Sequence, residues 1–237
     1  NWGAKKLHQT NKQMNKTENR TRYGAVANAY DAFLTFSGFK RGIENFLTRL
    51  NLELPPRATI LDAGCGTGLL ACYFARRFPA AQIYATDVDV KMLREMEQIA
   101  RKKGLSAKNI VIAKNDLKTP ELITPLGRRE ETVLPEKHFD AVFVSGALEH
   151  VPLTESVTRL ARLLKPGGTL LNLGMRRSPA GAVLGMMYGV RPYKISEMQR
   201  AFERAGLESI RVIKLLVEDF PANLSRVAII GIKCARP

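Results

Sequence analysis

A short apolar run ends in an acidic residue and is followed by three glycines at alternate positions. Asp62 is followed by Gly64, Gly66 and Gly68, and a helix-forming stretch comes next. Glycines let the backbone turn sharply and approach a ligand, and the helix start presents free N–H groups. Position 69 is leucine and no Gly-Lys pair follows, so this is neither a dinucleotide fingerprint nor a P-loop. An acid beside the turn disfavours pyrophosphate and favours a cationic ligand.

A second acidic residue ends the next apolar run. Asp87 lies 19 residues after Gly68. A carboxylate at the end of the second strand can accept two hydrogen bonds from a ribose diol. Asp89, two residues further on, is predicted to cap the helix that follows. The two acidic residues therefore indicate a site for a ligand that carries a cation and a ribose.

The elements that must position these residues alternate along the chain. Apolar runs and helical periodicity predict strands at 58–62, 82–86, 109–113, 139–145, 169–173, 209–217 and 226–233, and helices at 69–78, 90–103, 153–164 and 196–205. Alternating strands and helices imply βαβ units and a mainly parallel sheet. The last two strands have no helix between them and must pair antiparallel. Ligands of such sheets bind at the carboxyl ends of the strands.

This chain resembles the class I S-adenosylmethionine-dependent methyltransferases, of the type 11 kind, over residues 23–237. Besides the glycine turn and Asp87, the matching segments are Lys114–Leu117, Phe139–Ser145, Leu148–Val151 and Leu163–Gly168. The resemblance implies an α/β, Rossmann-like fold whose seven-stranded, mostly parallel sheet has an antiparallel last strand and helices on both faces. It also implies that S-adenosyl-L-methionine is the cofactor.

The resemblance implies a role for each residue of the site. Gly64, Cys65, Gly66 and Gly68 would lie under the methionine and ribose, Asp62 near the ammonium group, and Asp87 on both ribose hydroxyls. Val88 and Leu117 would contact the adenine, Asn115 or Asp116 would face its amino group, and Ser145 would lie near the sulfonium. Cys65 is a common filler of this turn rather than a nucleophile.

A catalytic base is required if the acceptor is a weakly acidic O–H, N–H or C–H. His150 is the first candidate, because it follows the fourth strand on the substrate side. The alternative is that Glu149-His150 caps or orients that loop. Tyr23 and Tyr30 are candidates for substrate binding in a helical lid at 23–50, with ordinary helix packing as the alternative. Residues 26–41 are similar to the N-terminal helices of ubiquinone and menaquinone C-methyltransferases.

Three other segments stand apart from the alternation. Residues 1–22 carry six Lys or Arg and one Glu without hydrophobic periodicity, so we expect a basic mobile tail. Residues 178–193 are glycine-rich and apolar, and we expect a substrate-side loop that forms a pocket wall or touches a membrane surface. A polar connection of about twenty residues, 118–137, is also predicted to be a loop.

Composition narrows the class of protein but not the partner. The net charge is +15, from 37 basic and 22 acidic residues, which suits nucleic acid, an anionic membrane surface or plain solubility. Three cysteines and three scattered histidines argue against disulfides and metal, so we expect a cytoplasmic location, with peripheral membrane contact as an alternative. The resemblance implies methyl transfer, and the apolar segment at 178–193 favours a small apolar or aromatic acceptor, quinone-like or lipid-like. The alternatives are an RNA or protein methyltransferase and a non-catalytic cofactor-binding module.

Overall fold

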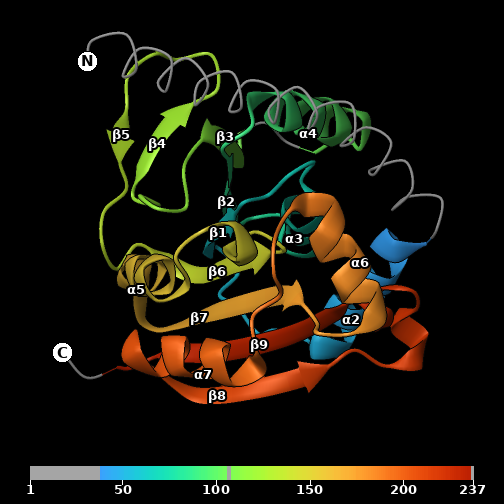
Figure 1. Ribbon diagram of the computed structural model, residues 1–237. Coiled ribbons are helices and arrows are strands. Elements are labelled where there is room, and N and C mark those ends of the chain that lie inside the picture. The colour runs from blue at the N-terminus through green and yellow to red at the C-terminus, as the bar shows by residue number, and fades with distance from the viewer. Residues whose placement is uncertain (1–37, 106–107, 236–237) are drawn as a thin grey trace, which may run out of the picture.

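The fold is built on one twisted nine-stranded sheet. The structure is a computed structural model and describes residues 38–105 and 108–235. The strand order is β5-β4-β3-β2-β1-β6-β7-β9-β8 (Figure 1). The strands are β1 (Thr59–Ala63), β2 (Gln82–Asp87), β3 (Ile110–Lys114), β4 (Leu122–Pro125), β5 (Thr132–Val133), β6 (Phe139–Ser145), β7 (Leu164–Met175), β8 (Leu207–Lys214) and β9 (Arg226–Lys233).

The seven predicted strands are all present, and the predicted fold class is confirmed. Strands β3, β2, β1, β6 and β7 pair in parallel with one another, in that order across the sheet. The last strand, β9, is inserted between β7 and β8 and runs antiparallel to both. Because β9 runs in the opposite direction, its first residue lies at the edge of the sheet where the parallel strands end.

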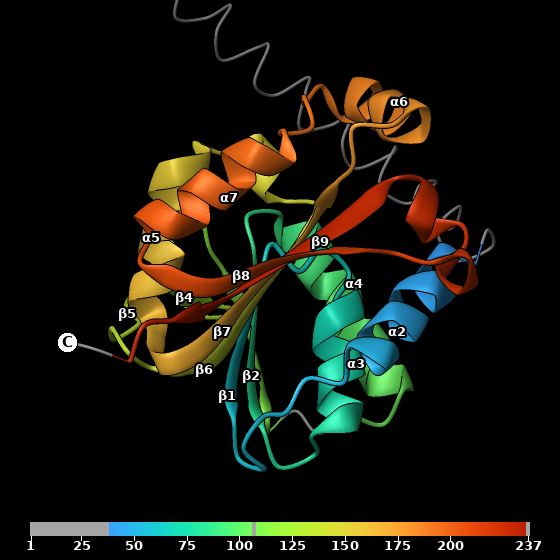
Figure 2. The ribbon, with the colours of Figure 1, turned by 90° about the horizontal axis from the view of Figure 1, so that it is seen from below.

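Helices cover both faces of the sheet. They are α2 (Phe39–Leu50), α3 (Leu69–Arg77), α4 (Val90–Lys102), α5 (Leu153–Leu163), α6 (Pro179–Tyr188) and α7 (Ile195–Arg204). Figure 2 shows α2, α3 and α4 on one face and α5 and α7 on the other. Each face has its own apolar core: Phe74 of α3 stacks on Phe143 with ring centroids 4.1 Å apart, and Phe202 of α7 is fully buried on the opposite face.

The connection at 118–137 is more ordered than its polar sequence predicts. It contains β4 and β5, which extend the sheet beyond β3 in antiparallel pairs. β4 has four residues and ends in a proline, and β5 has two exposed residues, so these strands carry little of the alternating apolar pattern on which a strand prediction rests. This is why the sequence predicted a loop there.

The glycine-rich segment at 178–193 also differs from expectation, because most of it forms helix α6. The Ser178 side chain caps the helix by accepting a 3.1 Å hydrogen bond from the amide of Gly181, and Pro179 occupies the first turn. Gly189 ends the helix in the left-handed conformation. The capping signals outweigh the low helix propensity of the glycines.

Several predictions fall outside the described residues. They are the basic tail at 1–22, the first part of the helical lid, and the two tyrosines, Tyr23 and Tyr30. Within the described residues, the C-terminal part of that lid is helix α2, which packs Ile43 and Phe46 into the core. No helix in the described ranges is long and apolar enough to cross a bilayer.

Candidate functional site

The glycine turn and the end of β2 are joined by backbone hydrogen bonds. The amides of Gly64 and Cys65 both donate to the carbonyl oxygen of Thr86, at 2.8 and 2.9 Å. The amide of Gly66 donates a 2.8 Å hydrogen bond to the carboxylate of Asp87. These bonds hold the turn after β1 against the carboxyl end of the neighbouring strand, as the parallel pairing of β1 with β2 requires.

The three glycines of the turn have left-handed backbones but different surroundings. A side chain on Gly64 would collide with Ala147, and one on Gly68 would collide with Met96 of α4. A side chain on Gly66 would meet no atom within 4 Å among the described residues. Gly64 and Gly68 therefore permit close packing, whereas Gly66 faces open space above the turn.

Asp62 is buried beneath the turn. It is 1% exposed, and its Oδ2 accepts a 2.9 Å hydrogen bond from the amide of Ala71 in the first turn of α3. Its other oxygen, Oδ1, is buried with no hydrogen-bond partner in the described part of the chain. Burial, reinforced by the charge of Asp87, raises the pKa of Asp62 to about 7. A carboxylate in this position has capacity left for a cation.

Asp87 is half-buried at the end of β2. Its oxygens accept hydrogen bonds from the amides of Gly66 and Asp89, at 2.8 and 2.9 Å. A carboxylate has about four acceptor positions, so further donors can still be bound. Burial raises its pKa, and the two backbone donors oppose that shift. Val88, the next residue, is 52% exposed and offers an apolar surface beside this carboxylate.

The prediction that Asp89 caps a helix is confirmed. Its side chain accepts a 2.8 Å hydrogen bond from the amide of Lys91 at the start of α4. This assignment leaves Asp87 as the acid of β2 that is available to a ligand.

The side chains of the three residues after β3 differ in how accessible they are to a ligand. The Asn115 amide is buried and donates to the carbonyl oxygens of Thr119 and Leu122, so it holds the turn toward β4. Asp116 is exposed, and its Oδ1 accepts from the amide of Lys118. Leu117 is buried and points at the glycine turn. Of the two polar candidates for the adenine amino group, Asp116 has the accessible side chain.

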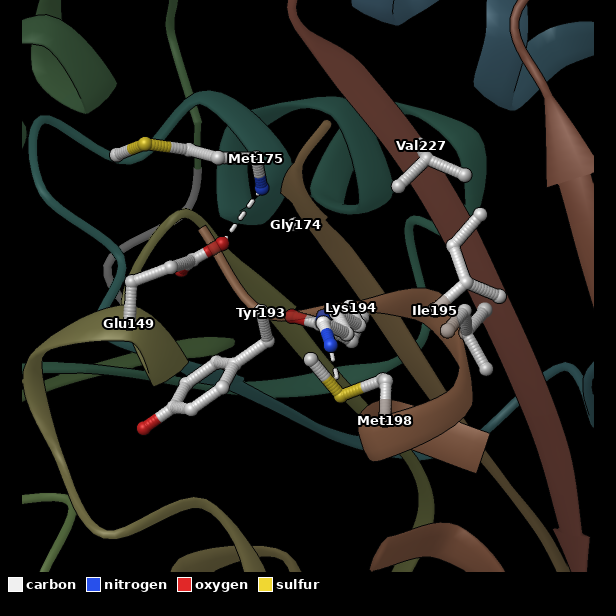
Figure 3. Close-up of a pocket in the computed structure, with 10 residues that line it drawn as sticks. Glu149, Gly174, Met175, Tyr193, Lys194, Ile195, Met198 and Val227 are labelled. Carbon is white, nitrogen blue, oxygen red and sulfur yellow. Dashed lines mark hydrogen bonds between the residues drawn. The ribbon is translucent and has the colours of Figure 1, made fainter. Parts of the chain in front are cut away.

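β6 ends at Ser145, and the 3₁₀ turn that follows it carries Glu149 and His150. Glu149 is buried, and its Oε1 accepts a 2.5 Å hydrogen bond from the amide of Met175 at the end of β7 (Figure 3). Its carboxylate lines a cavity of about 10 Å³, which has room for roughly one water molecule and not for an acceptor. Glu149 therefore anchors the 3₁₀ turn Leu148–His150 that carries His150.

His150 lies on the outer side of that turn. Its ring meets that of Tyr188, the last residue of α6, edge to face with centroids 6.2 Å apart. Desolvation lowers the pKa of His150, and the charges of Glu149 and Asp87 oppose that shift. A neutral imidazole at neutral pH can accept a proton.

Cys65 lies inside the turn as an inert group. It is buried, and burial together with the charges of Asp62 and Asp87 raises the pKa of its thiol well above the ordinary value. A thiol in this state is a poor nucleophile.

Two features of this edge were not predicted from the sequence. Helix α6 brings the ring of Tyr188 edge to face with that of His150. The Ser178-Pro179 pair is a helix-start signal from which α6 could have been predicted. Arg226 begins β9 and lies against Gly146, which follows Ser145. A single arginine at the start of a strand carries no local signal that could have found it.

Comparisons with known proteins point to a methyltransferase domain. Residues 61–170 match the family model of a methyltransferase domain. The chain is 27% identical to a ubiquinone/menaquinone biosynthesis C-methyltransferase of Pseudomonas fluorescens over 204 residues, which cover 84% of this chain and 73% of the relative. It is 36% identical to a ubiquinone biosynthesis O-methyltransferase of Xanthomonas oryzae over 140 residues, where the match spans about half of each, 56% and 51%.

Solved structures share the fold. A geranyl diphosphate C-methyltransferase from Streptomyces coelicolor, solved with S-adenosyl-L-homocysteine, matches with a TM-score of 0.63 at 15% identity. The match covers 80% of this chain and 78% of that one. At this identity the likeness supports the fold, with the methyltransferase order of strands and helices.

Proposed function

We propose that this chain, whose residues 61–170 match the family model of a methyltransferase domain, transfers a methyl group from S-adenosylmethionine to a small acceptor with an apolar or aromatic body. The observation that carries the proposal is the convergence of Asp62 and Asp87 on the glycine turn. Residues 23–237 would form the methyltransferase domain.

The residues present fit S-adenosylmethionine. The unpartnered Oδ1 of Asp62 suits the ammonium group of the methionine part, and the free acceptor positions of Asp87 suit the ribose diol. Gly66 leaves open space for a ligand against the turn, and the exposed Val88 supplies an apolar contact for adenine. Asp116 is the better placed acceptor for the adenine amino group, because the Asn115 side chain is engaged in its turn.

The chemistry at the methyl group requires little from the protein beyond placement. The bound cofactor supplies an electrophilic methyl group with its own leaving group. Ser145 ends β6, and Ser145 and the following Gly146 would set the position of the acceptor. His150 would take a proton from the acceptor, held in place by Glu149 and with Tyr188 over its ring. Orientation of the reactants would provide the main rate gain, about 7–11 kcal/mol at most.

Exposed apolar side chains border this edge of the sheet and support an apolar acceptor. Met186 of α6 is 83% exposed, and Phe220, which follows the 3₁₀ turn Val217–Asp219, is 60% exposed. The two segments are tied together, because Ser178 Oγ donates a 2.6 Å hydrogen bond to the carbonyl oxygen of Leu224. This rim suits a quinone-like or lipid-like molecule, and it would also allow the protein to touch a membrane surface.

The experiment is methyl transfer from radiolabelled S-adenosylmethionine. The full chain is incubated with quinols, phenolic acids, lipids, total RNA and a cell extract that contains protein, and Asp87→Ala is the matched inactive control. We expect label in a small acceptor with the parent and not with the variant. Label in RNA or protein would favour the alternative that rests on the +15 charge. Cofactor binding with no labelled product from any extract would favour a non-catalytic binding module.

A further inference from the structure

The first residue of β9 places a positive charge at the ligand edge of the sheet. Arg226 pairs in register with Met175, the last residue of β7. Its guanidinium lies against Gly146, where an added Cβ would be 2.7 Å from Nη1 and 3.1 Å from Nη2. Gly146 follows Ser145, so the guanidinium is next to the segment where the acceptor would sit.

Two of the three nitrogen atoms of this guanidinium are buried without a polar partner in the described ranges. Arg226 is 6% exposed, and its Nε and Nη1 make no hydrogen bond in the described part of the chain. Its contact there is with the ring of Phe39 in α2, whose centroid lies 5.5 Å from the guanidinium carbon. Arg49 of α2 differs from Arg226, since its guanidinium donates two hydrogen bonds to the carboxylate of Asp219.

A buried charge without a partner opposes folding. Removing a guanidinium from water costs several kcal/mol, and apolar residues of similar volume often replace buried charges without loss of stability. The stacking on Phe39 recovers a part of that cost. A group that anchors a structure would be expected to have its hydrogen bonds satisfied, as Arg49 does. The three N–H donors on Nε and Nη1 of Arg226 are instead left for an external acceptor.

We propose that Arg226 binds an oxyanion on the methyl acceptor, a carboxylate or a phosphate group. The planar fork of a guanidinium matches both groups through paired hydrogen bonds. The acceptor would then be an amphiphile, with its anionic group on Arg226 and its apolar body against the exposed rim that includes Met186 and Phe220. This inference rests on the proposed function, because it takes Ser145-Gly146 as the place of methyl transfer.

Calorimetry on the full chain saturated with S-adenosylhomocysteine tests the proposal. The probes are benzoate, phenyl phosphate and the neutral benzyl alcohol. The variants are Arg226→Met, which keeps the side-chain bulk, and Arg226→Lys, which keeps the charge without the fork. Arg211→Met is the control for loss of one charge, since Arg211 is exposed on β8.

We expect benzoate or phenyl phosphate to bind the parent about tenfold or more tightly than benzyl alcohol. Arg226→Met should remove that advantage, Arg226→Lys should keep part of it, and Arg211→Met should keep all of it. The affinity for S-adenosylhomocysteine should stay within about twofold in every variant, because the cofactor is assigned other contacts. The melting temperature of unliganded Arg226→Met should not fall, whereas a purely structural role would lower it.

Equal anion affinity in the parent and Arg226→Met would overturn the proposal, and so would a parent that binds neither anion. If Arg226→Met does not fold, the Nε–Hε signal of Arg226 in the parent decides, since it must shift on addition of the bound anion. Failure of S-adenosylhomocysteine to bind the folded parent would count against the proposed function instead. The anion titrations on the unliganded chain would then still decide the role of Arg226.

Discussion

The amide of Gly66 donates a 2.8 Å hydrogen bond to the carboxylate of Asp87, and this bond links the ends of the two central strands. It joins the one glycine of the turn that faces open space to the acid that has acceptor positions to spare. Backbone and carboxylate are thereby held in a fixed relation before any ligand arrives. Such preorganisation reduces the entropic cost of binding.

The glycine turn gives a first prediction, because Gly66 faces open space whereas Gly68 packs against Met96. Gly66→Ala should destabilise the fold by about 1 kcal/mol, the cost of a left-handed alanine, and weaken S-adenosylhomocysteine binding about tenfold or more. Gly127→Ala is the matched control, since Gly127 also has a positive φ and open surroundings but lies in the β4–β5 connection. Thermal unfolding and calorimetry on both variants check this. Equal cofactor affinity in the two variants would contradict the assignment of Gly66.

Gly68→Ala should behave differently from Gly66→Ala. Its added methyl group would meet Met96 of α4, so overpacking adds about 1–3 kcal/mol to the backbone cost. For a domain of this length, each kcal/mol lowers the melting temperature by about 2–4 °C. A melting temperature no lower than that of Gly66→Ala would show that Met96 moves aside freely.

Asp62 predicts an unusual dependence of stability on pH. Its folded pKa, about 7, lies above the ordinary value of 3.8. The folded state therefore holds the proton more tightly, and the contribution of Asp62 to the free energy of unfolding falls as pH rises from about 4 to about 7. Asp62→Asn should remove that decline, while Asn can still accept from the amide of Ala71. Denaturant unfolding of both proteins across this range measures the difference.

The same group should make cofactor binding depend on pH. A bound ammonium group favours the ionised carboxylate, so the affinity of the parent for S-adenosylhomocysteine should rise with pH up to about 7. Asp62→Asn should bind more weakly and with less dependence on pH. A pH profile identical in the two proteins would remove Asp62 from the ammonium site.

His150 is predicted to act as the base. Because the pKa of His150 is lowered, kcat/KM should decline with falling pH only below pH 6.5, the ordinary pKa of histidine. His150→Gln should lower kcat by about 10²–10⁴-fold and leave cofactor affinity unchanged. His138→Gln is the control, since His138 precedes β6 at the opposite edge of the sheet. An unchanged kcat in His150→Gln would mean that the acceptor needs no base from this residue.

The sequence predicted the parts of the site that are formed by residues close together along the chain. The run from Asp62 to Gly68 and the end of β2 at Asp87 are local patterns, and the strand–helix alternation brings the two together. Arg226 could not be predicted, because its contact with Gly146 joins positions 80 residues apart in the chain. Helix α6 was missed since its glycines weighed more heavily than the Ser178-Pro179 cap.

The ion pair between Arg49 and Asp219 gives a prediction about the rim of the site. Asp219 is fully buried and accepts from Arg49 and from the amide of Leu216, which fixes the 3₁₀ turn to α2. Asp219→Ala removes the acceptor of the Leu216 amide and of the more exposed Arg49, and it should cost about 1–3 kcal/mol. Chemical denaturation measures this. Arg159→Ala, which breaks a more exposed pair with Glu121, should cost about 1 kcal/mol or less. Similar losses in both variants would contradict the role given to Asp219.

Calorimetric titration of S-adenosylhomocysteine into the parent, Asp87→Ala and Glu97→Ala tests the central claim most directly. Glu97 lies on α4 and pairs with Arg101, so its variant controls for the loss of one negative charge. We predict that the parent binds, that Glu97→Ala binds equally well, and that Asp87→Ala binds about 100-fold more weakly, because two charge-assisted hydrogen bonds are lost. A folded parent that does not bind, or equal affinity in Asp87→Ala, would contradict the account.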